Sequence, residues 1–428
     1  MNHSSKDKDH TGDTKKVLVI AYHFPPLAGA GMLKILRTVR YLSKYNWSPV
    51  VLTVKNPEPY HRSTNAVPSD VEIYRSWRIP GGHLLARLMR RLKLDERWLL
   101  LPDQHLLWIP CTFFYGIYLM IRKRIDLIYV TGPPYSALIA GALLKTFTGK
   151  ALVVDVRDPW SFNAARRGYP SKAHRLLDRI YEKWVLRTAD HITCIYHITA
   201  NGYYRLYDWT KDKISVFYDT VDLADLPAPD PGCGKQGQFV LTYLGTFYPP
   251  FISLKATLEA IKRLMERGEI EPDKFCFNYV GPVDFTFNKL AAEYGLTSVI
   301  RQTGYKPIHE ALKEAAQSEM LLLLLEFATI NTKLFDYLAT GNTILAVVPE
   351  FGELDDLLRR YADRYYKITD FDHLKIAESI KQCYNDFQSG KLGDKLCKRD
   401  LFLRELNIER ETEALTQVFS SSLKERQH

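Results

Sequence analysis

Lys333 and Asp336 lie three residues apart, where a strand and a short loop are expected to lead into a helix. A lysine in the first helical turn meets the positive end of the helix dipole, which is unfavourable unless an anion binds there. A phosphate at this position would also receive backbone N–H groups of the helix start. The Asp336 carboxylate could accept hydrogen bonds from the two hydroxyls of a ribose. The pair therefore suggests a nucleotide site, and the alternative is an ordinary i, i+3 surface pair.

A second group of reactive residue types follows the strand expected at 151–156, in the run Asp-Val-Arg-Asp-Pro-Trp (155–160). Open α/β sheets keep their sites at the carboxyl ends of their strands. Asp158 is therefore a candidate general base, with Arg157 as its charged neighbour in the catalytic group. Because Asp158 precedes a proline, it could instead simply cap the next helix.

Glycines mark three further turns after expected strands. Gly29 and Gly31 follow the first strand together with His23, and could let the backbone approach a phosphate or an acceptor. Their spacing is not that of the dinucleotide fingerprint, because Lys34 stands three residues after Gly31. The alternative is a loop that only needs positive φ angles. Later turns at Gly245-Thr246 and at Gly281 have the same form.

The element that positions Lys333 is a βαβ unit. The apolar run 321–325 is short and unbroken, as in a parallel strand buried on both faces. Thr332 is the expected N-cap of the following helix, Leu334 and Leu338 share one face, and Gly341 ends the helix before a strand at 343–348. Alternating strands and helices of this kind recur along the chain and predict an α/β fold with two Rossmann-like domains.

Composition suggests where the two domains begin and end. We expect a disordered polar tail at 1–15, a first domain at 16–225, a Pro/Gly-rich linker at 226–238, a second domain at 239–395 and a C-terminal helix at 396–428. The chain is expected to be helical after Phe351, and its last helices are expected to pack back across the domains.

The net charge of +9 is unevenly distributed. Residues 1–225 carry 33 Lys and Arg against 20 Asp and Glu, which indicates that this half faces something anionic. The six cysteines have no C-x-x-C or His-rich spacing, so we expect neither a metal site nor disulfides. The start of the chain lacks the apolar core of a signal peptide, and no apolar segment is long enough to span a bilayer. A cytoplasmic location is expected.

A basic amphipathic helix is expected at 81–94, followed by a segment rich in aromatic rings at 98–121 that includes Trp98, Trp108 and Tyr118. Such a pattern suits anionic lipid headgroups, so the protein could lie peripherally at the inner face of the plasma membrane. The alternative is a core helix with a solvated basic neighbour.

Taken in order, these segments resemble the GT-B glycosyltransferases, and among them glycosyltransferase family 4, in particular its bacterial polysaccharide subgroup. The resemblance covers about residues 15 to 420 and rests on five motifs. These are Tyr-His-Phe-Pro-Pro with its glycines (22–31), Asp-Val-Arg-Asp-Pro-Trp (155–160), Phe-Tyr-Asp-Thr-Val-Asp (217–222), Tyr-Leu-Gly-Thr (243–246) and Lys-Leu-Phe-Asp-Tyr-Leu-Ala-Thr-Gly (333–341).

The resemblance implies transfer of a sugar, with retained configuration, from a UDP- or GDP-linked donor to a glycan or lipid-linked acceptor of cell-surface polysaccharide synthesis. It implies no obligatory metal and a donor held by the second domain. The donor-binding residues would be Lys333, Asp336, Thr332, Leu334, Gly245, Thr246 and Gly281. The chain departs from the family pattern in three ways. Ala328 stands where a first glutamate is usual and Glu326 is out of register, the usual basic pair is missing from 245–251, and Arg157 replaces a histidine.

Two other classes of function remain open at this stage. A sugar-nucleotide epimerase shares the two-domain architecture but would need more acid and base groups than the expected cleft offers. A non-catalytic protein that binds membranes or nucleic acid would explain the basic first half, although no recognisable nucleic-acid module is present. We therefore expect no nucleic-acid partner.

Overall fold

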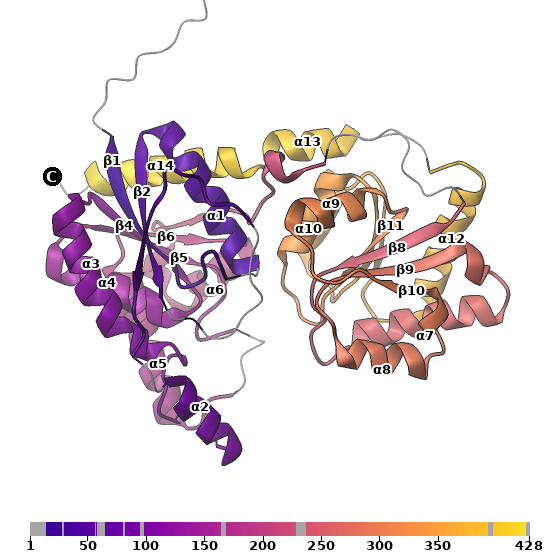
Figure 1. Cartoon of the computed structure of the whole chain (residues 1–428), viewed down its shortest axis with the longest axis horizontal. Helices are drawn as coiled ribbons and strands as arrows, with labels where there is room; N and C mark the ends of the chain where they lie inside the picture. Colours follow the sequence, from indigo (N-terminus) through magenta and orange to yellow (C-terminus); the bar gives the residue numbers. More distant parts are fainter. Residues whose placement is uncertain are drawn as a thin grey trace, which may run out of the picture. The chain divides into compact units, whose positions relative to one another are not determined.

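The computed structural model describes residues 14–27, 30–55, 57, 65–79, 82–94, 98–163, 168–227, 237–392 and 397–424. The chain forms two compact units, coloured from indigo to magenta and from orange to yellow over most of their length (Figure 1). Unit 1 comprises Met1–Ile195, Thr199–Phe217 and Thr412–His428, and unit 2 comprises Tyr196–Ile198 and Tyr218–Glu411. Gly29, most of the expected tail (1–13) and most of the expected linker (228–236) lie outside the described residues.

Unit 1 is built on a seven-stranded parallel sheet in the order β3-β2-β1-β4-β5-β6-β7. Its strands are β1 (Lys15–Ile20), β2 (Trp47–Val54), β3 (Glu72–Ser76), β4 (Leu127–Gly132), β5 (Ala151–Val156), β6 (His191–Cys194) and β7 (Ile214–Val216). Leu18 and Ile20 pack on one face of the sheet, and Val17 and Val19 pack on the other. Because both faces are covered, the central strands are apolar without alternation.

Helices cover both faces of this sheet. Helices α3 (Ile109–Lys123), α4 (Tyr135–Thr148) and α5 (Lys172–Thr188) pack on the Leu18 face, and α1 (Ala30–Leu42) and α14 (Ile408–Lys424) pack on the Val17 face (Figure 1). Phe419 of α14 contacts the rings of Trp47 and Tyr129, with centroids 5.2 and 5.3 Å away. The expected return of the C-terminal helix is thus confirmed. Unit 1 also contains α2 (Gly82–Arg91) and most of α6 (His197–Leu206).

Unit 2 is built on a six-stranded parallel sheet in the order β10-β9-β8-β11-β12-β13. Its strands are β8 (Phe239–Leu244), β9 (Phe275–Val280), β10 (Ile300–Gln302), β11 (Met320–Leu324), β12 (Thr343–Val347) and β13 (Tyr365–Ile368). The expectation that the chain is entirely helical after Phe351 is wrong, because β13 extends this sheet beside β12.

Helices α7 (Ile252–Glu266), α8 (Phe285–Glu293) and α12 (His373–Gln388) form the apolar core on one face of this sheet. Helices α9 (Ile308–Ala316) and α10 (Thr332–Thr340) lie on the other face (Figure 1). The remaining helices are α11 (Gly352–Tyr361) and α13 (Cys397–Glu405). None of the helices in the described part of the chain is long and apolar enough to cross a membrane.

Each sheet has one place where the chain reverses its direction of travel across the strands. This point lies between β1 and β4 in unit 1 and between β8 and β11 in unit 2. Open parallel sheets bind ligands outside the carboxyl ends of the two strands at such a point. The loops after these four strands are therefore where a site is expected.

Candidate functional site

Lys333 lies in the first turn of α10, and its side chain reaches the loop that follows β8. Its Nζ is 2.5 Å from Tyr243 Oη and 3.2 Å from the carbonyl oxygen of Thr246. It also lies 4.1 Å from the centroid of the Tyr243 ring, within the range of a cation–π contact. The ammonium of Lys333 is therefore held at the reversal point between β8 and β11.

Burial lowers the pKa of the Lys333 ammonium. Desolvation lowers the pKa of Lys333 to about 7, and the neighbouring Asp336 carboxylate only partly opposes that shift. The interpretation of Lys333 and Asp336 as an ordinary surface pair is wrong, because Asp336 is only 7% exposed. An amine with this pKa gains its positive charge when an anion is placed beside it.

Glycines at two turns let the loops after β8 and β9 lie close together beside Lys333. Gly245 has φ of +90°, and a Cβ there would lie 2.9 Å from Cε of Lys333. A Cβ on Gly281 would lie only 2.4 Å from the carbonyl oxygen of Gly245. The Gly245 N–H donates to the carbonyl of Val280 at 2.7 Å, so the loops after β8 and β9 are in direct contact. Gly281 thus has no room for a side chain, and the positive φ of Gly245 would strain any other residue.

Tyr337, one turn after Lys333, holds β8 and β11 where they separate. The two strands pair only at Met320 with Leu241 and at Leu321 with Thr242. Farther along, the Leu244 N–H donates to Tyr337 Oη, and that hydroxyl donates to the carbonyl of Leu322, both at 3.1 Å. Tyr337 thus replaces ladder hydrogen bonds with its side chain and keeps the carboxyl ends of the strands apart.

Glu326, which follows β11, has a structural role at the same edge. Its carboxylate accepts the backbone N–H groups of Ile252 and Ser253 at 3.2 and 3.1 Å, and the Ser253 hydroxyl at 2.6 Å. A carboxylate at a helix start satisfies N–H groups that have no partner within the helix. Glu326 therefore caps α7 and connects the loop after β11 to the loop after β8.

Two details of the expected α10 helix need correction. Asn331 is the N-cap and Thr332 is the first helical residue, so the assignment of Thr332 as N-cap is wrong. Leu334 is fully buried, and its N–H donates to the Asn331 carbonyl at 3.2 Å. Its side chain therefore packs inside the unit and does not line the site.

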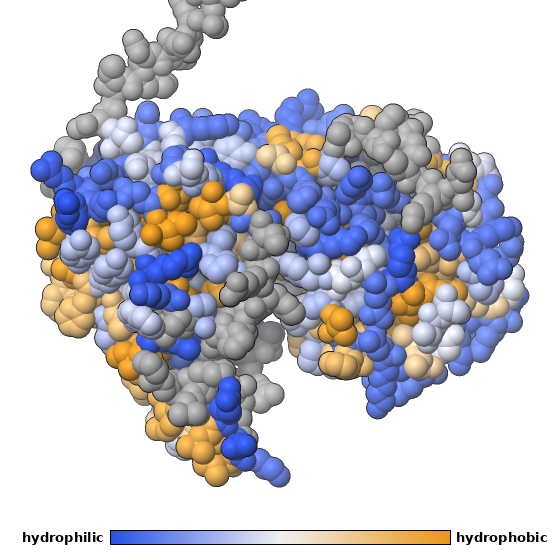
Figure 2. Space-filling view, in the orientation of Figure 1, coloured by the Kyte–Doolittle hydropathy of each residue, from blue (hydrophilic) through white to orange (hydrophobic). Residues whose placement is uncertain are grey.

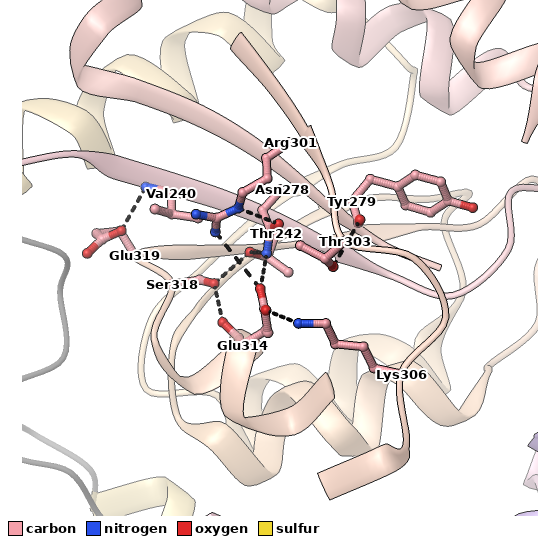
Figure 3. Close-up of polar contacts among 10 residues, drawn as sticks. All are labelled: Val240, Thr242, Asn278, Tyr279, Arg301, Thr303, Lys306, Glu314, Ser318 and Glu319. Atoms are coloured by element: carbon pink, nitrogen blue, oxygen red, sulfur yellow. Dashed lines mark hydrogen bonds and ion pairs between the residues drawn. The ribbon is translucent and has the colours of Figure 1, made fainter. Parts of the chain in front are cut away.

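A polar network fixes α9 on the same face of the sheet (Figure 3). Asn278 of β9 donates to Glu314 of α9 at 2.9 Å and accepts from Arg301 Nε at 3.0 Å. Lys306, in the loop before α9, forms an ion pair with Glu314. Although burial alone would raise the pKa of Glu314, hydrogen bonds from Lys306 and Asn278 hold it below its ordinary value. The network anchors the loop that follows β10 beside the loops of the site.

Large apolar side chains are exposed on the loops at this edge and on the first residue of α8. They come after β8, β9, β10 and β11 and are Tyr248 (67% exposed), Val283 (69%), Phe285 (85%), Tyr305 (44%) and Phe327 (39%). Exposed aromatic side chains at the carboxyl edge of a sheet provide flat faces on which a base or a sugar ring can stack.

In unit 1, Arg157 follows β5 and contacts the first turn of α1 and the last residue of β4, next to the reversal point between β1 and β4. Its guanidinium donates to the carbonyl of Gly31, and its N–H donates to the carbonyl of Gly132 at 2.9 Å. It is only 8% exposed. Arg157 and Gly31 are thus brought together, and His23 lies half-buried between β1 and α1. Arg157 therefore holds the start of α1 and the end of β4 in place beside its own loop.

Asp158 is exposed after the end of β5. Its loop is held by hydrogen bonds to side chains of α5. Asp178 accepts from Trp160 Nε1 at 2.8 Å, and Glu182 accepts from the Ser161 N–H at 3.0 Å and from the Ser161 hydroxyl at 2.7 Å. Burial raises the pKa of Glu182 despite these hydrogen bonds. Asp158 does not cap a helix, because the next described helix starts at Lys172 and is capped by Ser171.

Several residues that shape the two edges escaped prediction: Tyr243, Tyr337, Asp178 and Glu182. The spacing of Tyr337 from Lys333, one helical turn, was the available signal for that tyrosine. Among the described residues no group of three or more His, Cys, Asp or Glu side chains could hold a metal ion.

Residues 33–219 match the family model of the glycosyl transferase 4-like domain. The structure is similar over its whole length to the sucrose-phosphate synthase of Thermosynechococcus elongatus, with a TM-score of 0.68, 13% identity, and 95% of this chain and 98% of that chain covered. No curated protein sequence matches the chain.

A glycosyltransferase of Rickettsia africae is similar with a TM-score of 0.66 and 11% identity, covering 96% of this chain and 100% of that one. A trehalose-6-phosphate protein of E. coli, solved with UDP-2-fluoro glucose, is similar with a TM-score of 0.61 and 11% identity, covering 96% and 99%. At these identities the likeness concerns the fold, which is the GT-B arrangement of two parallel α/β sheets.

Proposed function

We propose, from the premise that this chain is a glycosyltransferase of the GT4-like type with a GT-B fold, that it moves a sugar from a nucleotide-sugar donor to a glycan or lipid-linked acceptor. The proposed pathway is the synthesis of a cell-surface polysaccharide. Donor binding is assigned to unit 2 and acceptor binding to unit 1. A lipid-linked acceptor would bring the enzyme to a membrane surface as a peripheral protein.

The observation that carries the proposal is the position of Lys333. Its ammonium lies beside the Gly245-Thr246 turn, at the reversal point of the unit 2 sheet. A diphosphate placed there would meet the Lys333 ammonium, the N-terminus of α10 and a turn without a side chain. These are the groups needed to stabilise negative charge on a leaving diphosphate.

The remaining roles in unit 2 follow from this placement. Asp336 would accept hydrogen bonds from the ribose, and Gly281 lets the loop after β9 approach the nucleotide. The exposed rings of Tyr305 and Phe285 offer stacking faces for the base. The E. coli relative was solved with a UDP sugar, which favours UDP as the first nucleotide to test, with GDP as the second.

Asp158 is the proposed acid/base residue of unit 1 because it is exposed at the end of β5 on a firmly held loop. In an inverting reaction its carboxylate would take the proton of the acceptor hydroxyl. In a retaining reaction, which the family favours, a donor phosphate oxygen takes that proton. Arg157 is then a positioning residue for the loops around Asp158.

A thermal-unfolding screen with UDP, GDP and their sugars tests donor binding. We expect one diphosphate to raise the Tm, since a ligand at 100 times its Kd adds about 2.7 kcal/mol to the unfolding free energy. No shift with any of these ligands would contradict the proposal. NMR of the anomeric proton in the product then distinguishes retention from inversion.

The same reaction mixtures separate transfer from isomerisation. A glycosyltransferase leaves the donor unchanged until an acceptor is added, apart from slow hydrolysis. Conversion of a nucleotide sugar to its epimer without any acceptor would instead indicate a sugar-nucleotide epimerase.

A further inference from the structure

The outer surface of α5 combines apolar side chains with positive charge. Three of its large apolar side chains are exposed: Leu176 (61%), Leu177 (41%) and Ile180 (52%). Its exposed cations include Lys172, Arg175 and Lys183. The two acidic residues of this helix, Asp178 and Glu182, are both fully buried. The solvent side of α5 therefore presents apolar and cationic groups without a carboxylate.

The described residues of 82–94 and 98–99 also combine exposed apolar side chains with positive charge. Its exposed apolar side chains are Leu88 (51%), Leu92 (59%), Leu94 (47%), Trp98 (48%) and Leu99 (56%). Its exposed cations include Arg87, Arg91 and Lys93. Met89 is buried, and the Leu94 N–H donates to its carbonyl at 2.9 Å, which holds the segment after α2 against that helix. Orange and blue residues alternate at the tip of unit 1 that carries α2 (Figure 2).

Trp98 connects this segment to α5. Its ring lies 4.7 Å from the ring of His174 of α5, and its carbonyl oxygen is 3.4 Å from His174 Nε2. The exposed residues of 87–99 and of 172–183 named above thus belong to one surface of unit 1, which we call the α2–α5 face.

We propose that the α2–α5 face docks on an anionic lipid bilayer. Leucine, isoleucine and tryptophan side chains interleaved with lysine and arginine match the acyl boundary and the anionic headgroups of such a bilayer. An acidic protein surface would match the cations but leave the interleaved apolar side chains against carboxylates, and a second copy of this positive face would be repelled. Charge complementarity therefore selects the lipid surface.

Docking through this face would place the bilayer next to the acceptor side of unit 1. The inner side of α5 holds Trp160 and Ser161, and so holds the loop that carries Asp158. A lipid-linked acceptor could then reach Asp158 without leaving the bilayer. This last step rests on the proposed function, whereas docking itself does not.

Co-flotation with vesicles tests the docking. The full chain is expected to float with phosphatidylcholine–phosphatidylglycerol vesicles at low salt, and far less with phosphatidylcholine alone. The triple variant Leu176→Glu, Leu177→Glu, Ile180→Glu should lower the partition coefficient at least about 100-fold. Lys172→Gln with Arg175→Gln should lower it about 25-fold on the anionic vesicles only, since each cation near the surface contributes about fivefold.

The matched control uses another exposed apolar stripe of the same unit, on α3. Its members are Phe114 (71% exposed), Tyr118 (52%) and Ile121 (76%). Changing all three to Glu should leave flotation within about twofold of the unmodified protein. An unchanged Tm shows that each variant is folded. An unchanged Tm increase on adding UDP shows that membrane docking and donor binding are independent.

Three results would overturn the docking proposal. The first is failure of the unmodified protein to float with anionic vesicles at low salt. The second is loss of flotation in the α3 variant with retention in the α5 variant. The third is a dimer in solution that the α5 variant converts to a monomer, which would make the face an interface between two copies.

Discussion

The affinity for a nucleoside diphosphate should depend on pH through Lys333. Burial lowers the pKa of this lysine to about 7, so the free protein loses the charge of its ammonium as pH rises above 7. A bound diphosphate favours the ammonium and raises the pKa of Lys333 again. Binding above pH 7 must therefore take up a proton, and the affinity must fall as pH rises.

The magnitude follows from the pKa. At pH 8 about one lysine in ten is protonated in the free protein, so UDP should bind about tenfold more weakly than at low pH, and about tenfold more weakly again at pH 9. The decline ends where pH reaches the pKa of Lys333 in the complex. The secondary phosphate of a nucleotide ionises near pH 6, so measurements from pH 7 upward are free of that titration.

Isothermal titration calorimetry in two buffers of different ionisation enthalpy measures both the affinity and the proton uptake. Lys333→Met should bind more weakly at pH 7 and show no decline between pH 7 and pH 9. Lys289→Met removes an exposed lysine of the same unit and should keep the full decline. Glu326→Gln should affect UDP binding less than Lys333→Met. A flat profile in the unmodified protein, or the same slope in Lys333→Met, would refute the reasoning.

Three further predictions concern packing, catalysis and stability. Gly281→Ala should lower the unfolding free energy of unit 2 by about 1–3 kcal/mol in denaturant titration, because the new Cβ would meet the Gly245 carbonyl at 2.4 Å. The control Gly352→Ala has open space around its Cβ and should change the unfolding free energy by less than about 0.5 kcal/mol. Asp158→Asn should abolish transfer by an inverting enzyme without changing UDP affinity, and near-normal turnover would remove Asp158 from the catalytic role. Burial raises the pKa of Glu319 to about 7. The folded protein therefore favours the protonated carboxyl, and the stability this group provides is complete below its unfolded pKa and is lost as pH rises through 7. Glu319→Gln should raise the Tm at pH 8 and leave it unchanged at pH 4.

The regular elements of unit 2 were predictable because their apolar runs are short and clearly bounded. The strands predicted at 321–325 and 343–348 are β11 (Met320–Leu324) and β12 (Thr343–Val347), and Gly341 ends α10 with φ of +79° as expected. β13 was missed because Tyr365–Ile368 is half-buried at the sheet edge and has no continuous apolar run. The single C-terminal helix expected at 396–428 is divided into α13 and α14, a break that no glycine or proline announces.

Side-chain roles were less predictable because they depend on contacts between distant residues. Trp108 was expected among rings at a membrane interface, but it is fully buried and its Nε1 donates to the Ser76 hydroxyl at 2.9 Å. The sequence did not single out the acids of α5, yet Asp178 and Glu182 hold the loop before that helix. Periodicity locates a face of a helix but does not show what that face meets.

Mass spectrometry of the reaction products shows whether the protein transfers a sugar and whether Lys333 is needed for it. The unmodified protein would be incubated with a panel of UDP and GDP sugars and with glycan and lipid-linked acceptors, beside Lys333→Met at equal concentration. We expect one acceptor whose mass increases by one sugar residue, with one nucleoside diphosphate released per transfer, and at least about 100-fold slower product formation by Lys333→Met. Equal product formation by the two proteins would contradict the assignment of the donor site to Lys333.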